Sequence, residues 1–249
     1  MRTVVWFSAG AASAVAAKIA VTERKNVAIA YTDPGSEHED NKRFMADCEK
    51  WFGQEIIRLK SDRYVDTWDV FSKTRYLNGV GGARCTVELK KRVRFTSQQP
   101  EDEQVFGYTS DEKARAYRFR ENNPDVELWT PLIDKGITHG DTLAIIEDAG
   151  IDLLVMYKLG YGHNNCIGCV KGGMGYWNKI RRDFPEHFNR MAKLEREIGA
   201  SCIKNQYLDE LDPQVGRYQD EPSIECSLLC ATLSEQLTVT STISKGVNK

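Results

Sequence analysis

The sequence predicts an α/β fold with a doubly wound, mostly parallel sheet, and three observations lead to this expectation. Short runs of β-branched and aromatic residues alternate with helical stretches along the chain. The first two of these runs are each followed by a loop and a helix, which implies parallel strands with right-handed crossovers and helices on both faces. The composition, 41% hydrophobic and 28% charged over 249 residues, is that of a globular chain long enough to bury a core.

Each element follows from a local pattern. Strands are predicted where apolar residues run together between turn residues, at 3–7, 27–32, 55–59, 104–108 and 127–132. Helices are predicted where apolar residues recur with helical spacing: from the first loop to about residue 24, at 37–52, 67–74, 111–121, 138–149, 176–182 and 185–198, and in a basic stretch after residue 85. Residues 157–175 are rich in glycine, so we expect them to be irregular.

The net charge and the hydropathy of the sequence argue against two classes of protein, general nucleic-acid binders and membrane proteins. A formal net charge of −2 argues against a protein whose whole surface binds nucleic acid, and the basic run at 90–94 is either a local patch or a solvated helix face. No stretch approaches the roughly 18 to 20 apolar residues that cross a bilayer, and the N-terminus begins with a strand pattern rather than a signal peptide. We therefore expect a cytoplasmic protein without membrane contact. Its seven cysteines would be reduced there, which favours metal or redox chemistry over a disulfide scaffold.

A loop of small residues joins the first strand to its helix. Such a loop offers backbone N–H groups and the positive end of a helix dipole to a phosphate. The residues that we expect to bind a nucleotide phosphate in this way are Ser8, Ala9, Gly10, Ala11 and Ser13. A tight turn packed under the sheet is the alternative interpretation.

Two further loops follow strand ends and so are expected at the same edge of the sheet. After the second strand, Asp33 and Gly35 lie in a turn whose carboxylate would meet a ribose or an adenine, or would form an Asx-turn that caps the next helix. After the fourth strand come Gly107 and then Arg115, whose guanidinium suits a phosphate or sulfate. An exposed helix face would look similar to the second of these motifs.

The cysteines form the most specific motif. The Cys-x-x-Cys of Cys166 and Cys169 can present two thiolates to one metal centre, and Cys85 lies far upstream in a basic segment. Zinc is the alternative to an iron–sulfur cluster at this site. Cys48 and Cys202 have no cysteine near them in the sequence, so we expect both to be packing residues.

These motifs resemble those of the phosphoadenosine phosphosulfate (PAPS) reductase family, within the adenine nucleotide α-hydrolase-like (PP-loop) superfamily. The first loop resembles the pyrophosphate loop Ser-Gly-Gly-x-Asp-Ser, with Ala9 in place of a glycine and Ala12 in place of the aspartate. The turn at 33–37 resembles the Asp-Thr-Gly stretch of these reductases. Residues 107–115 lie where the family has Gly-x-Arg-x-x-Glu-Ser-x-x-Arg, with Tyr108 in place of the first arginine. The resemblance spans about residues 1–170 and implies a nucleotide-binding domain at 1–200, followed by a C-terminal tail at 201–249.

The cysteines are similar to those of the cluster-binding PAPS and adenosine phosphosulfate (APS) reductases, where a cysteine pair precedes a distant Cys-x-x-Cys. The resemblance implies a [4Fe–4S] cluster on Cys85, Cys166 and Cys169, with one iron open or with a fourth ligand, which we assign to Cys230. The tail segment Glu-Cys-Ser-Leu-Leu-Cys at 225–230 resembles the Glu-Cys-Gly-Leu-His tail of the reductases. This likeness implies that Cys226 is the nucleophile that attacks sulfur. In the rival interpretation Cys226 itself completes the cluster.

The resemblance implies an oxidoreductase of sulfur metabolism, similar to the compact family members found in phage genomes. It would reduce APS or PAPS to sulfite with a thioredoxin- or glutaredoxin-like partner. The second interpretation is an ATP-dependent, iron–sulfur-cluster-dependent sulfurtransferase that modifies tRNA or DNA, for which the basic run at 90–94 would be suited. The third is a non-catalytic nucleotide-binding module with a structural metal site. Association into a homo-oligomer stays open in all three.

Overall fold

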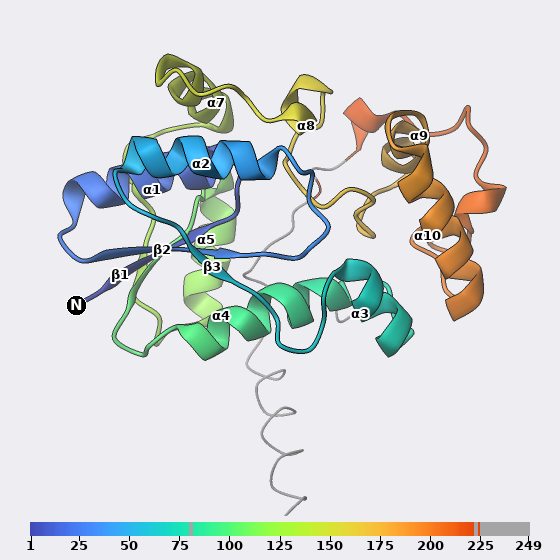
Figure 1. Cartoon of the computed structure of the whole chain (residues 1–249), viewed down its shortest axis with the longest axis horizontal. Coiled ribbons are helices and arrows are strands. Elements are labelled where there is room, and N and C mark those ends of the chain that lie inside the picture. The colour runs from blue at the N-terminus through green and yellow to red at the C-terminus, as the bar shows by residue number, and fades with distance from the viewer. Residues whose placement is uncertain (80–81, 222–223, 225–249) are drawn as a thin grey trace, which may run out of the picture.

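A computed structural model describes residues 1–79, 82–221 and 224 of the chain. Its centre is a five-stranded sheet in the order β3-β2-β1-β4-β5, in which all neighbouring strands run parallel (Figure 1). The strands are β1 (Thr3–Phe7), β2 (Val27–Thr32), β3 (Ile57–Leu59), β4 (Glu103–Val105) and β5 (Leu128–Trp129). The chain extends the sheet first on one side of β1 and then on the other, so the strand order reverses between β1 and β4. The predicted α/β class with a parallel sheet is therefore confirmed.

Helices join the strands and continue beyond the sheet. The first half of the described chain contains α1 (Ala11–Glu23), α2 (Asn41–Phe52), α3 (Thr67–Thr74), the π-helix η1 (Thr86–Lys91), α4 (Arg92–Ser97), the short η2 (Ser110–Glu112) and α5 (Lys113–Asn122). The second half contains α6 (Pro131–Asp134), α7 (His139–Asp148), α8 (Val155–Lys158), α9 (Met174–Asp183), α10 (Pro185–Ile198), η3 (Leu208–Glu210) and η4 (Tyr218–Asp220).

Three predicted boundaries differ from the structure by three residues or more, each because of the local backbone. The helix expected from residue 37 begins at Asn41, because the preceding segment turns at Gly35, where φ is +65°. The strand expected to run to residue 108 ends at Val105, before the loop that carries Gly107. The strand expected at 127–132 has two residues, because Pro131 lies at the first turn of α6, where its missing N–H costs nothing.

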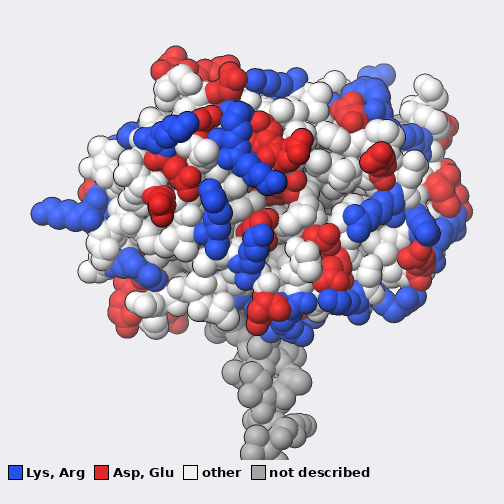
Figure 2. Space-filling view, viewed as in Figure 1, with Lys and Arg blue, Asp and Glu red and all other residues white. Residues whose placement is uncertain are grey.

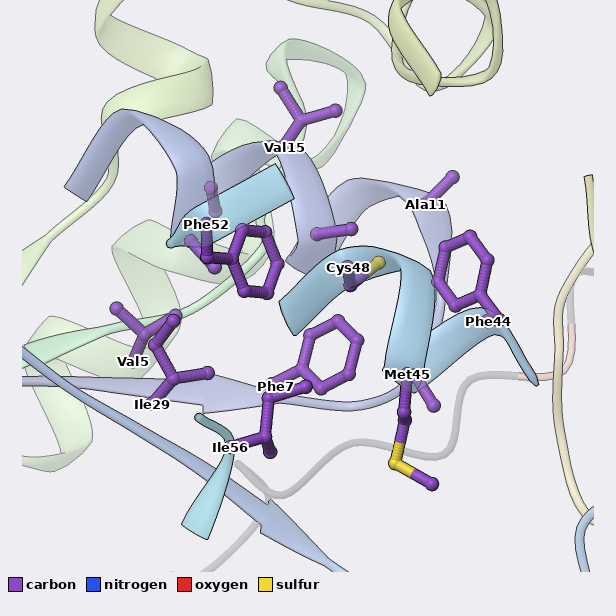
Figure 3. Packing of buried hydrophobic residues seen from close by; sticks show 14 of the residues in the cluster. Val5, Phe7, Ala11, Val15, Ile29, Phe44, Met45, Cys48, Phe52 and Ile56 are labelled. Carbon is purple, nitrogen blue, oxygen red and sulfur yellow. The ribbon is translucent and has the colours of Figure 1, made fainter. Parts of the chain in front are cut away.

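Side chains of β1 alternate between the two faces of the sheet. Val5 and Phe7 enter a core beneath α1 and α2, where Phe7 stacks on Phe44 with ring centroids 6.5 Å apart (Figure 3). Val4 and Trp6 enter the core on the opposite face, which includes Phe106 of the loop after β4 and Phe119 of α5. In Figure 1, α1 and α2 lie on one side of the sheet and α4 and α5 on the other.

A second core lies beside the sheet rather than on it, around α3, α9 and α10 (Figure 1). Trp68 of α3, Trp177 of α9 and Phe188 of α10 are buried in it. Leu208, Leu211 and Ile224 pack there as well, so part of the segment after residue 200 belongs to the same core as α9 and α10.

The surface mixes charges of both signs. Figure 2 shows lysines and arginines interspersed with carboxylates over the face in view, rather than gathered into one continuous basic field. Among the described residues, no helix is both long enough and apolar enough to cross a membrane.

Candidate functional site

A cleft opens at the carboxyl ends of β1 and β4, where the strand order reverses. Ligands of open α/β sheets bind at such positions because the two neighbouring loops diverge there. The lining residues come from seven parts of the chain: Trp6, Ser8, Gly10, Ala12 and Ser13 around the first loop; Lys90 of η1; Phe106, Gly107, Tyr108, Glu112 and Arg115 after β4; His139; Tyr157; His163, Asn164 and Asn165; and Ile224. Five of the predicted nucleotide-binding residues, Ser8, Gly10, Ser13, Gly107 and Arg115, line this cleft.

The small-residue loop is held by its last serine. The Ser13 hydroxyl accepts the Ser8 N–H at 3.0 Å and donates to the Gly10 carbonyl at 2.9 Å. Ala9 adopts φ +53°, the left-handed region where glycine is favoured, so the loop has the backbone of a glycine-containing turn with alanine in it. Ala11 opens α1, and its N–H donates to the Tyr157 hydroxyl at 3.3 Å. The N-terminal turn of α1 therefore faces the cleft beside a phenol.

Gly107 allows the loop after β4 to contact α1 backbone to backbone. A Cβ atom at this position would lie 2.7 Å from the Ser13 nitrogen and 2.9 Å from the Ala12 carbonyl carbon. Only a glycine fits that approach, which brings the two predicted phosphate-binding segments into contact.

Cationic and imidazole groups line the wall opposite the small-residue loop. Arg115 is ion-paired with Glu112, and its guanidinium lies 5.5 Å from the Tyr108 ring centroid. The His139 and His163 rings lie 5.3 Å apart. Burial, and secondarily the charge of His139, lowers the pKa of His163, so this imidazole is neutral near pH 7. Neither histidine is predicted from the sequence, because no spacing motif links them.

Asp33 and Gly35 line a different depression, beside β2 and β3. The Asp33 carboxylate accepts the Gly35 N–H at 2.8 Å and pairs with Lys60 at 3.1 Å. Asp33 therefore forms an Asx-turn, but the expectation that this turn caps the next helix is wrong, because the N-cap of α2 is Asp40. The structure does not bring Asp33 to the cleft between β1 and β4.

The basic run at 90–94 is largely buried, so the alternative of a solvated helix face is wrong for most of it. The relative exposures of Lys90, Lys91 and Arg94 are 6%, 4% and 2%. Lys90 extends to the buried Glu37 carboxylate, with 3.3 Å between Nζ and Oε1, and it also lines the cleft. The helical register after residue 85 therefore turns cations inward, whereas the charge of the run alone favoured a solvated face.

The Cys-x-x-Cys segment lies against the cleft and is braced by a buried tyrosine. Cys166 and Cys169 are 9% and 8% exposed, and Gly168 between them adopts φ +76°. The Tyr176 hydroxyl accepts the Cys169 N–H at 2.8 Å and donates to the Cys166 carbonyl at 3.4 Å. Cys85 lies at the N-cap of η1 and packs against the second core, which contains Cys169.

One asparagine joins the cysteine segment to the small-residue loop. Asn164, 8% exposed, donates its side-chain N–H groups to the Ala9 carbonyl at 2.8 Å and to Asn41 Oδ1 at 3.0 Å. Its neighbour Asn165 donates to the Ile224 carbonyl at 2.8 Å. Both asparagines line the cleft and directly precede Cys166, a signal that the sequence analysis overlooked.

Within the described ranges, no three histidine, cysteine, aspartate or glutamate side chains stand close enough together to hold one metal ion. Cys226 and Cys230, predicted as nucleophile and ligand, lie outside the residues that the structure describes.

Comparison with known proteins adds a distant likeness. No protein-family model matches the chain. The chain is similar to an uncharacterized protein of Methanocaldococcus jannaschii, with 24% identity over 184 residues that make up 70% of this chain and 37% of that protein. The chain thus matches little more than a third of the relative's length.

Proposed function

We propose that the protein is a PAPS reductase-like oxidoreductase that binds an adenylyl sulfate in the cleft between β1 and β4 and releases sulfite. One observation carries the proposal: the small-residue loop and the segment that leads into Cys166 line the same cleft and are joined by Asn164. An anion-binding loop and a cysteine segment that meet at one opening suit a reaction at the sulfur of a nucleotide.

The lining residues support binding of a doubly anionic group. The first turn of α1 supplies backbone N–H groups and the positive end of its dipole, while Lys90 and Arg115 supply cations. Ala12 stands in the lining where a metal-binding loop would have a carboxylate. This favours a substrate that is already activated, such as APS or PAPS, over adenylation by ATP with a loop-bound metal.

Cys226 is the proposed nucleophile, and it follows Ile224 of the cleft by two residues in the sequence. Its thiolate attacks the sulfur of the adenylyl sulfate, the bond from sulfur to the phosphate oxygen breaks, and the adenosine nucleotide leaves. The product on the enzyme is an S-sulfocysteine. A dithiol protein of the thioredoxin or glutaredoxin class then attacks the Cys226 sulfur, releases sulfite and ends as a disulfide, which supplies the two electrons.

The donor set next to the cleft fits an iron–sulfur cluster better than a single ion. A zinc site needs its donors around one atom at about 2.0 to 2.3 Å, whereas each cysteine of a [4Fe–4S] cluster binds a different iron. Cys85, Cys166 and Cys169 would hold the cluster in partly or fully buried positions. When bound, the cluster would supply a redox-active centre close to the cleft.

The proposal is tested by incubating anaerobically purified protein with APS or PAPS and a dithiol, and by measuring sulfite and released nucleotide. Cys226→Ser should abolish sulfite release and leave nucleotide affinity unchanged. Cys48→Ser, a buried thiol in the core beneath α1 and α2, is the matched control and should retain activity. Sulfite release at the wild-type rate by Cys226→Ser would remove the proposed nucleophile, and a failure to bind either nucleotide would remove the substrate class.

A second candidate, ATP-dependent sulfur transfer to tRNA or DNA, is supported by a groove along α9. Lys179, Arg181, Arg182 and Arg217 line it, and such a set of cations suits a polyanion. This activity predicts that the right nucleic acid stimulates cleavage of ATP to AMP and pyrophosphate. Absence of that cleavage across a panel of tRNA and DNA substrates would contradict it.

A further inference from the structure

Arg94 of α4 carries a positive charge into the interior of the protein, where its relative exposure is 2%. In the described part of the chain, its buried Nε atom has no hydrogen-bond partner and its guanidinium forms no ion pair. Arg92, two residues earlier, by contrast lies 3.2 Å from the Glu88 carboxylate. Burial of a charge away from opposite charges is costly, so packing alone does not explain an arginine at this position.

Three aromatic rings pack around the guanidinium. The Arg94 Cζ atom lies 4.6 Å from the Phe95 ring centroid, 5.6 Å from that of Phe106 and 6.0 Å from that of Phe119. The faces of such rings attract a cation, but less strongly than a carboxylate does. Burial lowers the pKa of Arg94 to about 10, which leaves the side chain charged at neutral pH. The rings therefore compensate the charge only in part.

This charge lies directly behind the wall of the cleft between β1 and β4. Phe106, which contacts the guanidinium, lines the cleft, and so does Tyr108, whose ring centroid lies 6.1 Å from that of Phe106. Lys90 lines the cleft as well, and Arg94 follows it by four residues in the continuous helix of η1 and α4, which places both side chains on one side of that helix. Arg94 is not itself a lining residue, so its charge acts on the cleft across Phe106 rather than by contact.

On the basis of the proposed function, which places an anionic nucleotide in this cleft, we propose that Arg94 is a fixed, buried cation of the cleft wall that attracts the 5′-phosphoryl group of the nucleotide. A charge held in a dry wall acts through a low dielectric and is screened little by salt. At an effective dielectric constant of about 20, a unit charge at roughly 8–10 Å from an anion changes its affinity about 15- to 30-fold. The three rings hold the guanidinium in place before the ligand binds, so binding requires no reorganisation of this charge.

The test compares the binding of AMP and of adenosine to the full-length protein by calorimetry, because these two ligands differ only in the phosphate. Arg94→Met removes the charge and keeps an unbranched apolar side chain, so it should weaken AMP binding by about 15-fold or more and leave adenosine binding unchanged. Arg94→Lys retains the charge and should bind AMP with an affinity close to that of the wild type. Arg118→Met removes an exposed arginine of α5 outside the cleft and is the matched control, which should bind both ligands as the wild type does.

Wild-type AMP affinity in Arg94→Met would overturn this role of Arg94 alone. So would an equal loss of AMP affinity in Arg94→Met and Arg94→Lys, since packing rather than charge would then be responsible.

Thermal unfolding without ligand gives a second measurement. Arg94→Met should melt at or above the wild-type temperature, because an apolar group replaces a buried charge that its surroundings compensate only in part. A variant that melts well below the wild type would show that Arg94 contributes through its packing and would count against the proposed role. A wild-type protein that binds neither APS nor AMP would overturn the proposed substrate class and the role of Arg94 together.

Discussion

Gly107→Ala is the most direct test of the packing that forms the cleft. The added methyl group would lie 2.7 Å from the Ser13 nitrogen, 2.9 Å from the Ala12 carbonyl carbon and 2.9 Å from the Ser13 Cα. All three atoms belong to the backbone of α1, so no change of rotamer relieves the contact. The loop after β4 or the first turn of α1 must move, and overpacking of this kind costs about 1–3 kcal/mol of unfolding free energy.

The loss is measurable by thermal unfolding and by nucleotide binding. In a domain of this size, 1 kcal/mol lowers the midpoint by about 2–4 °C, so Gly107→Ala should melt about 2–12 °C below the wild type. Because the two displaced segments line the cleft, calorimetry should also show weaker binding of APS, by about 10-fold for each 1.4 kcal/mol lost from the complex.

The matched control is Gly140→Ala in α7. A Cβ atom there has only the Thr138 hydroxyl within 4 Å, at 3.8 Å, and alanine is the better helix former by about 1 kcal/mol. Gly140→Ala should therefore melt at or above the wild-type temperature with unchanged APS affinity. A Gly107→Ala protein that behaves like this control would refute the close approach of the β4 loop to α1 and, with it, the cleft as described.

Three further predictions concern side chains of the site. Arg115→Ala should weaken APS binding about 10- to 100-fold, since a hydrogen bond to a charged group contributes about 1.5–3 kcal/mol. The control is Arg118→Ala, which lies on the exposed part of α5 and outside the cleft and should bind APS as the wild type does. Tyr176→Phe leaves the buried Cys169 N–H without its acceptor and should lower the unfolding free energy by about 1–3 kcal/mol in denaturant titrations. The control Tyr117→Phe, at a position that is 63% exposed, should leave the unfolding free energy unchanged. The pKa of His163 is lowered on folding, so its contribution to stability is present above about pH 6.5 and is lost as the pH falls through the folded value. Unfolding free energies measured from pH 8 to 5 should therefore fall less steeply for His163→Asn, and parallel curves for the two proteins would contradict the neutral imidazole.

The sheet and half of the cleft follow from the sequence because they depend on local signals. Runs of β-branched residues specify β1 and β2, and a loop of small residues between a strand and an alanine-rich helix specifies the first wall of the cleft. Parallel strands bring their carboxyl ends to one edge, so the loops at Ser8 and Gly107 were expected at the same edge of the sheet. The same reasoning wrongly placed Asp33 in the cleft. Asp33 follows β2, which lies one strand farther from the point between β1 and β4 where the strand order reverses.

The rest of the site depends on tertiary contacts that no local pattern encodes. Lys90 is buried where it pairs with the Glu37 carboxylate. A run of charged residues in the sequence does not distinguish a buried ion pair of this kind from a solvated helix face. His139 and His163 meet because α7 and the cysteine segment lie on the same rim. Cys202 packs against the second core only because α10 returns the chain to it.

One of the links between the small-residue loop and the segment that leads into Cys166 is a buried asparagine. Asn164 donates to the Ala9 carbonyl of the small-residue loop and to Asn41 at the start of α2, and it precedes Cys166 by two residues. Displacing the small-residue loop or the cysteine segment would break a buried hydrogen bond at a cost of about 1–3 kcal/mol. These bonds therefore favour one arrangement of the two segments relative to each other. The proposed nucleotide, which would order the loop, and the proposed cluster, which would order the cysteines, would select the same arrangement. Each is therefore expected to strengthen the binding of the other by the same factor, since coupling between two binding equilibria is reciprocal.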